Sequence, residues 1–376
     1  MRKIVCVTGS RSEFGLLLST LKAIDTDPNF DLSLIVTGMH LSKKHGHTLD
    51  FVRNSGINIS KIIDLEINTG KSGFDTAVFS GKFLVEISKA LEEIKPDILL
   101  IEGDRFEKLP AAIAAAHLNI PIVHACGGDV SGSIDDATRH AITKFSHIHL
   151  PGSPKSYERI IKMGEEPWRV HMTGTPLYKE FSSKEKLNEK FGVDLFKKTI
   201  LVLQHPLNTQ SSEAGKQMEA TLKAAEFFNM QVIIIYPNTD SGSDQIIEVI
   251  KKYENKDNFF VFKNLDPESY MGLLNGVSVM VGNSSSGIVE TPLFKLPCVN
   301  IGSREGSRER ASNVLDAQHD ENDIKEKISL ALSDEFKESL NNMVNPYNSE
   351  NVESNICDVL NNIELGDKLI NKKMTY

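Results

Sequence analysis

Residues 277–292 read Val-Ser-Val-Met-Val-Gly-Asn-Ser-Ser-Ser-Gly-Ile-Val-Glu-Thr-Pro, which indicates a strand, a turn of small residues and the start of an apolar helix. The turn holds side chains too small to block a ligand, at Ser284, Ser285, Ser286 and Gly287. Their N–H groups and hydroxyls can meet an anion, such as a diphosphate, at the positive end of the helix dipole. Glu290 follows about one turn later, where its carboxylate can accept hydrogen bonds from sugar hydroxyls. The alternative is an ordinary serine-capped, buried helix.

The same alternation of short apolar runs and helical segments extends over the whole chain. In the first half we expect strands at residues 4–7, 34–36, 98–101, 120–123 and 148–150, and helices at residues 16–24, 77–94, 110–118 and 135–145. In the second half we expect strands at residues 200–203, 232–236, 259–262, 277–281 and 298–301, and helices at residues 211–228, 244–253, 267–274 and 287–293. This pattern predicts an α/β fold with two doubly wound parallel sheets, whose strand ends face each other across a cleft.

The length of the chain also favours two domains. Its 376 residues exceed one typical core, because domains average about 150 residues. We expect an N-terminal Rossmann-like domain at residues 1–178, a charged connection at residues 179–198 and a C-terminal Rossmann-like domain at residues 199–360. Residues 361–376 are expected to form a C-terminal helix that can cross back onto the first domain.

Composition excludes several classes of protein. A net charge of −9 argues against a nucleic-acid binder, which needs a basic face. No apolar run approaches the ~20 residues of a membrane span, and the N-terminus lacks the apolar core and cleavage site of a signal peptide. The four cysteines are scattered without paired spacing, as is typical of reduced thiols, at Cys6, Cys126, Cys298 and Cys357. We therefore expect a cytoplasmic protein that binds neither nucleic acid nor membrane.

Charged side chains follow the predicted strands of the first half. Arg11 lies in the glycine turn after the first strand, where its guanidinium can bind phosphate oxygens or simply be exposed. Acidic residues follow the next strand ends at Asp104, Glu107 and Asp129, and Asp135 opens a helix. A single acid in such a place is usually a helix cap, but several beside one cleft suggest acid/base catalysis.

The second half offers matching positions. His205 precedes a proline at a strand end, which favours a side chain at the cleft over one in a helix, with capping as the alternative. Asn238 follows the next strand. Arg308 lies with Arg304 and Arg310 on a glycine-bearing loop that suits an anionic ligand, and a solvated charge run is the alternative.

Two misleading signals carry little weight. His40, His45 and His47 cluster, but their spacing fits no helical ligand pair and no cysteine joins them, so we expect no metal site. The glycine and serine residues between 282 and 287 miss the G-x-S-x-G pattern, so a serine hydrolase is not supported.

Several motifs together resemble one known family, in order and over nearly the whole chain. They are Gly9-Ser10-Arg11-Ser12-Glu13, Thr37-Gly38-Met39-His40, Gly103-Asp104-Arg105-Phe106-Glu107, Gly127-Gly128-Asp129, Arg139-His140-Ala141-Ile142-Thr143-Lys144, Asp240-Ser241-Gly242-Ser243-Asp244 and Gly282-Asn283-Ser284-Ser285-Ser286-Gly287. The set resembles the hydrolysing UDP-N-acetylglucosamine 2-epimerases of sialic acid and legionaminic acid biosynthesis. One departure is Asp129, because many relatives carry the longer glutamate there.

The resemblance implies a GT-B arrangement and a homodimer or homotetramer. It also implies conversion of UDP-N-acetylglucosamine, or a related UDP- or GDP-linked acetamido sugar, into the nucleoside diphosphate and a free N-acetylmannosamine-type sugar. The route is anti elimination to a 2-acetamidoglucal followed by hydration, which needs no redox cofactor. The implied catalytic residues are Asp104, Asp129, Asp135, His205 and Glu107. The implied substrate-binding residues are Arg11, Glu13, His40, Arg105, Arg139, Asn238, Ser284, Ser285, Ser286, Gly287, Glu290 and Arg308.

Two other functions fit the same cleft. A GT-B glycosyltransferase would pass the sugar to an acceptor, and a nucleotide-sugar sensor would bind without turnover. The sequence leaves open whether the sugar is N-acetylglucosamine or a 4-acetamido-6-deoxy relative, whether the base is uracil or guanine, and which carboxylate acts in which step.

Overall fold

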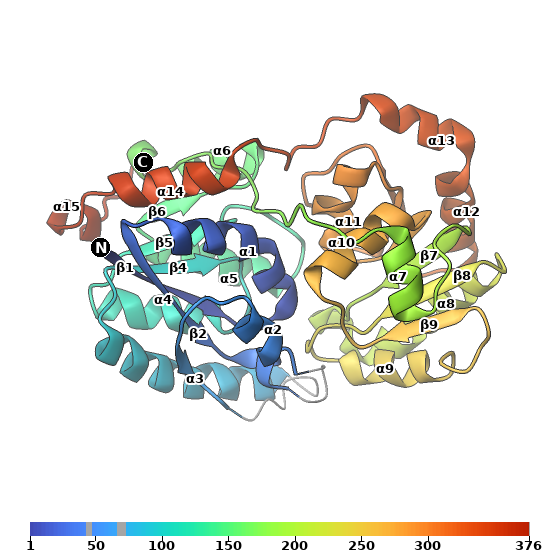
Figure 1. Cartoon of the computed structure of the whole chain (residues 1–376), viewed down its shortest axis with the longest axis horizontal. Coiled ribbons are helices and arrows are strands. Elements are labelled where there is room, and N and C mark those ends of the chain that lie inside the picture. The colour runs from blue at the N-terminus through green and yellow to red at the C-terminus, as the bar shows by residue number, and fades with distance from the viewer. Residues whose placement is uncertain (43–46, 66–72, 376) are drawn as a thin grey trace.

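Two six-stranded parallel sheets form the centre of the protein (Figure 1). The computed structural model describes residues 1–42, 47–65 and 73–375. The first sheet has the order β3-β2-β1-β4-β5-β6, with β1 (Arg2–Thr8), β2 (Phe30–Val36), β3 (Ile59–Ile62), β4 (Ile98–Glu102), β5 (Ile122–Ala125) and β6 (Ile148–Leu150). Its neighbouring strands all pair in parallel, so their carboxyl ends lie at one edge of the sheet.

The second sheet repeats this topology. Its order is β12-β11-β10-β7-β8-β9, with β7 (Thr199–Leu203), β8 (Gln231–Ile235), β9 (Phe259–Phe262), β10 (Val279–Gly282), β11 (Cys298–Ile301) and β12 (Val314–Ala317). In each sheet the strand order reverses beside the first strand, between β1 and β4 and between β7 and β10. Doubly wound folds bind ligands at such points. The predicted α/β fold with two doubly wound sheets is confirmed.

Helices cover both faces of each sheet (Figure 1). Strands β4 and β7 are buried along their whole length for this reason. In the described part of the chain, no helix is long and apolar enough to cross a membrane. The helices are α1 (Arg11–Thr26), α2 (Leu49–Asn54), α3 (Gly73–Ile94), α4 (Lys108–His117), α5 (Ile134–Phe145), α6 (Pro154–Lys162), α7 (Lys184–Phe191), α8 (Ala214–Glu226), α9 (Ser243–Lys251), α10 (Pro267–Gly276), α11 (Ser286–Val289), α12 (Glu321–Leu332), α13 (Asp334–Ser339), α14 (Val352–Asn362) and α15 (Asp367–Ile370).

The outer edge strands β3 and β12 are missing from the sequence-based prediction. Both are partly exposed, so each mixes apolar with polar residues, as in Ile-Ser-Lys-Ile and Val-Leu-Asp-Ala. These polar, exposed positions break the apolar run on which the prediction depends, whereas the other edge strands, the buried β6 and the apolar β9, are predicted from the sequence.

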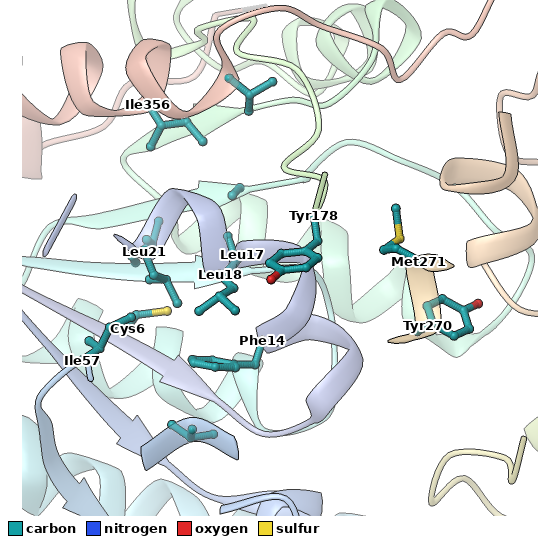
Figure 2. Packing of buried hydrophobic residues seen from close by; sticks show 14 of the residues in the cluster. Cys6, Phe14, Leu17, Leu18, Leu21, Ile57, Tyr178, Tyr270, Met271 and Ile356 are labelled. Carbon is teal, nitrogen blue, oxygen red and sulfur yellow. The ribbon is translucent and has the colours of Figure 1, made fainter. Parts of the chain in front are cut away.

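The C-terminal chain returns to the first domain. Helix α14 packs on α1, where Ile356 shares an apolar cluster with Leu17 and Leu21 (Figure 2). The Asn361 amide donates to the Asp27 carboxylate at 3.2 Å. The chain therefore lies on the first domain from α14 onward, while the exact domain limits stay a prediction.

Candidate active site

A cavity of about 730 Å³ lies between the two domains, at the carboxyl ends of strands from both sheets. Its walls come from the loops after β1, β4 and β5 and from those after β7, β8, β10 and β11. This volume lies in the range of ligand-binding pockets. Most of the predicted site residues line it, namely Arg11, Glu13, Asp104, Arg105, Asp129, Asp135, His205, Asn238, Ser284, Ser285, Ser286, Glu290 and Arg308.

Two arginines at this cavity keep an unused hydrogen-bond donor. Arg11 Nη1 and Arg105 Nη2 are buried and have no hydrogen-bond partner among the described residues. Burial lowers the pKa of Arg11 to about 10, so its guanidinium is still charged at neutral pH. A buried cationic donor without an acceptor is unfavourable, so these groups indicate that an anionic ligand completes the site.

The serine turn after β10 is positioned by a backbone that only glycine fits. Gly282 has φ +146°, and an added Cβ would lie 2.0 Å from the Leu203 carbonyl oxygen. Next to it, the Asn283 side chain accepts from the His205 N–H at 2.6 Å and donates to the His205 carbonyl at 2.9 Å. The ends of β7 and β10 are thereby joined, and Ser284 and the following serines face the cavity.

The helix after this turn is shorter than the sequence predicts. Helix α11 ends at Val289, and a 3₁₀ turn (Thr291–Phe294) follows, because Pro292 has no N–H to continue an α-helix. A single turn has only a small dipole, so anion binding here depends on the serine N–H and hydroxyl groups and on the arginines.

Glu290 directly follows α11 and lies at the cavity wall. Burial raises the pKa of its carboxyl group, although Ser286 and Arg11 oppose the change. The Ser286 hydroxyl also bonds the Tyr270 hydroxyl at 2.5 Å. Glu290 is therefore held among hydroxyl groups, in surroundings that suit recognition of a sugar.

His205 is a neutral side chain at the cavity. Burial lowers its pKa well below the ordinary value, and the positive charges of Arg304 and Arg105 lower it further. Its Nδ1 accepts from the Asn238 N–H at 3.1 Å, which leaves the proton on Nε2. His205 can thus donate a hydrogen bond without carrying charge.

Three of the carboxylates that line the cavity have unlike surroundings. Asp104 forms an ion pair with Arg139 of α5. The pKa of Asp135 is raised to about 6. Burial is the main cause and the negative charge of Asp104 adds to it, whereas the positive charge of Arg304 lowers this pKa. Asp129 pairs with Arg308 at 2.5 Å. Carboxyl groups in unlike surroundings suit a site in which one group takes a proton and another gives one.

Two predicted residues stand behind the wall and do not line it. His40 is fully buried, with Nε2 3.0 Å from the Thr8 hydroxyl and Nδ1 2.8 Å from the Thr48 hydroxyl. Its ring nitrogens are both occupied, so the predicted substrate contact is replaced by a structural link. Gly287 packs on β11, where an added Cβ would lie 2.6 Å from the Cys298 sulfur.

Two further predicted residues support others at the site. Glu107 is fully buried and does not line the cavity, and its Oε1 accepts from Arg105 Nε at 3.0 Å, so it orients Arg105. Arg139 donates to the Asp129 carbonyl at 2.9 Å and to the Asp136 carboxylate at 2.8 Å, besides its pair with Asp104. It therefore orients the acids from behind the wall.

The sequence-based prediction missed some residues of the site. Glu102 lines the cavity, and burial raises its pKa to about 8, with the charge of Glu13 adding to the effect and Lys108 opposing it. Its place at a strand end, just before Gly103, was an available signal. Lys108 is fully buried and pairs with Glu13. Tyr270 lies inside the apolar α10, and no local pattern brings it to the cavity.

The described residues contain no group of three or more His, Cys, Asp or Glu side chains arranged to hold a metal ion. His45, from the histidine cluster noted in the sequence, lies outside those residues.

Comparison with known proteins agrees with this geometry. The sequence matches the family described as UDP-N-acetylglucosamine 2-epimerase over residues 22–361. It is 36% identical to the UDP-N,N'-diacetylbacillosamine 2-epimerase (hydrolyzing) of Legionella pneumophila, over 100% of both chains. It is 32% identical to a UDP-N-acetylglucosamine 2-epimerase of Neisseria meningitidis, over 89% of this chain and 88% of the relative.

The fold is shared with solved structures. The crystal structure of a UDP-GlcNAc 2-epimerase from Neisseria meningitidis bound to UDP-GlcNAc superposes with a TM-score of 0.79 at 17% identity, over 95% of this chain and 99% of that one. The two-domain GT-B arrangement expected from the sequence is thereby confirmed. By sequence and by fold, the chain belongs to the UDP-N-acetylglucosamine 2-epimerase family.

Proposed function

We propose that this protein is a hydrolysing nucleotide-sugar 2-epimerase, which converts a UDP-linked 2-acetamido sugar into UDP and the free 2-epimeric sugar. One observation carries the proposal: a single cavity holds three carboxylates in unlike surroundings and two buried arginines with unused donors. The names of the Legionella and Neisseria relatives, which act on UDP-N,N'-diacetylbacillosamine and UDP-N-acetylglucosamine, support it.

The first step is elimination. The C2 proton of an acetamido sugar is only weakly acidic, so its removal is coupled to departure of the diphosphate from C1. A carboxylate takes the C2 proton while the C1–O bond breaks, which yields a glycal with a C1=C2 double bond and UDP. Asp135 suits the base, because Arg304 and the first turn of α5 both favour its ionised form. Arg11 and Arg105 stabilise the charge that develops on the diphosphate.

The second step is hydration of the glycal. Water adds its hydroxide to C1 and gives up one proton to a carboxylate, while a second carboxyl group delivers a proton to the opposite face of C2. Asp104 and Asp129 are the candidates for these roles, because both line the same cavity. The net change is hydrolysis at C1 with inversion at C2, and no redox change occurs.

The nucleotide is assigned to the second-domain wall. Glu290 accepts hydrogen bonds from the ribose hydroxyls, and the neutral His205 donates from Nε2 to a diphosphate oxygen. The serine turn adds small donors, since Ser284, Ser285 and Ser286 all line the cavity.

We favour a 2,4-diacetamido-6-deoxy sugar over N-acetylglucosamine. The cavity wall near the acids includes apolar side chains, at Leu84 of α3, Leu109 and Ile113 of α4 and Ile134 beside Asp135. A C6 methyl group is stabilised against such a wall, whereas a C6 hydroxyl would lose hydrogen bonds to water there.

The test is incubation with UDP-N-acetylglucosamine, and separately with its 2,4-diacetamido-2,4,6-trideoxy relative, without an acceptor. We expect UDP and the free 2-epimeric sugar from both by NMR, with a higher kcat/KM for the trideoxy sugar. Transfer only when an acceptor is added would identify a glycosyltransferase. Binding without turnover of either substrate would identify a sensor.

We also propose that the enzyme works in the cytoplasm as a homodimer or homotetramer. All four cysteines are free, which supports a reducing compartment. Light scattering of the purified protein measures the assembly.

A further inference from the structure

Two loops from opposite domains meet beside the candidate catalytic acids. The arginine loop (residues 302–310) follows β11, and the acid loop (residues 129–136) runs from Asp129 into the first turn of α5. The Ser307 N–H donates to the Ser131 carbonyl at 3.3 Å. Gly132, with φ +116°, lies so close that an added Cβ would be 2.9 Å from the Ser303 carbonyl oxygen.

Glu305 holds two arginines of this loop in fixed directions. Its carboxylate is only 2% exposed, and its two oxygens accept from Arg304 Nη1 at 2.6 Å and from Arg308 Nε at 2.7 Å. Arg310 closes the turn by donating to the Glu305 and Gly306 carbonyls at 2.8 and 2.7 Å. The loop is therefore built to present two guanidinium groups.

Each guanidinium reaches a different carboxylate of the other domain. Arg308 Nη1 lies 2.5 Å from Asp129 Oδ2, and Arg304 Nη2 lies 3.7 Å from Asp135 Oδ2. The arginine side chains are 12 and 13% exposed. Pairs that are this well covered by protein are screened less than pairs on the open surface.

We infer that the arginine loop is a positioning device, in which Glu305 aims Arg304 at Asp135 and Arg308 at Asp129 of the other domain. This inference rests on the proposed function for its catalytic meaning, but the ion pairs are a property of the loops themselves. Burial is the largest cause of the raised pKa of Asp135, the negative charges of Asp104 and Asp240 add to it, and the positive charge of Arg304 opposes them. Arg304 therefore keeps the proposed base ionised to a lower pH than the same buried carboxyl group would reach without it.

The test separates charge from structure. Carboxyl carbons of ¹³C-labelled aspartate are titrated by NMR, and the Asp135 signal is identified by its loss in Asp135→Asn. In Arg304→Gln, we expect the Asp135 midpoint to move up by about one pH unit. Arg304→Lys keeps the positive charge, so its Asp135 midpoint should stay near that of the wild type. Arg310→Gln removes contacts within the loop but no charge facing the acids, and it should leave the midpoint unchanged.

A second measurement links the charge of Asp135 to catalysis. In the active enzyme, the acidic limb of kcat/KM should follow the NMR midpoint in every variant.

An unmoved midpoint in Arg304→Gln, or equal movement in Arg310→Gln, would overturn the inference. If the NMR shifts occur in a protein without epimerase activity, the proposed function fails and the charge-setting loop stands.

Discussion

The first-domain wall of the cavity carries buried ion pairs, whereas the second-domain wall combines serines, asparagines and a neutral histidine with aromatic and apolar side chains and with Asp240, Lys263 and Glu290. Asp104 with Arg139, and Glu13 with Lys108, are buried ion pairs of the first domain. The loops that form the two walls follow strands of sheets with the same topology. The difference shows that strand topology provides the place of the site, while the loops give the two walls their different side chains. The arginine loop joins the walls, because Arg304 and Arg308 of the second domain pair with Asp135 and Asp129 of the first.

The largest expected effect comes from neutralising the acids of the first wall. Asp104→Asn, Asp129→Asn and Asp135→Asn keep size but remove a proton acceptor, so each should lower kcat by about 10²–10⁴-fold. Affinity for UDP, measured by calorimetry, should change little, because none of the three aspartates is among the proposed nucleotide contacts. A variant within a few fold of the wild-type rate would mark its aspartate as a helix cap or turn residue.

Breaking the nucleotide contacts should affect binding more than chemistry. Arg11→Ala and Glu290→Ala each remove a charged hydrogen bond, which is worth about 1.5–3 kcal/mol, or roughly 10- to 150-fold in the Kd of UDP. Lys186→Ala, which breaks an exposed ion pair with Glu268, is a matched control and should bind UDP normally. Wild-type affinity in both test variants would contradict these assignments.

The charge of Asp135 predicts a pH dependence. Its pKa is raised to about 6, so below that pH the base is protonated and kcat/KM should fall tenfold per unit. In Asp135→Asn, most of the activity should be lost, and the remaining kcat/KM should no longer fall below pH 6. A wild-type limb near pH 4, or a limb near pH 6 that persists in the variant, would show that another group titrates.

The smallest effect concerns Glu102, a carboxyl of the first wall that the chemistry leaves unused. Its pKa is raised to about 8, so the folded state keeps a proton that the unfolded chain releases above its ordinary pKa. Stability from this group is complete below the unfolded pKa and is lost as pH rises through 8. The glutamine of Glu102→Gln does not titrate, so the variant has no such loss of stability. The difference between the Tm of the variant and that of the wild type should therefore increase from pH 5 to pH 9. A constant difference would show that Glu102 is ionised throughout.

The central strands and the strand-end residues could be predicted because they are local signals. A run such as residues 98–101 is apolar on both faces, and Asp104 follows it directly. The edge strands β3 and β12 could not be predicted, because exposed polar residues interrupt their apolar runs.

The remaining errors concern contacts between distant segments. His40 looks like a free loop histidine, and only its bonds to Thr8 and Thr48 show that it is structural. Tyr270 and the pair of Arg308 with Asp129 depend on docking of the two domains, which no spacing along the chain reveals.

Turnover in D₂¹⁸O tests the central claim most directly. The account predicts one deuterium at C2 of the released 2-epimeric sugar and no ¹⁸O in the released UDP, because the proton exchanges and the C1–O bond breaks. Product without deuterium at C2, or UDP that carries ¹⁸O, would contradict elimination and hydration at this site.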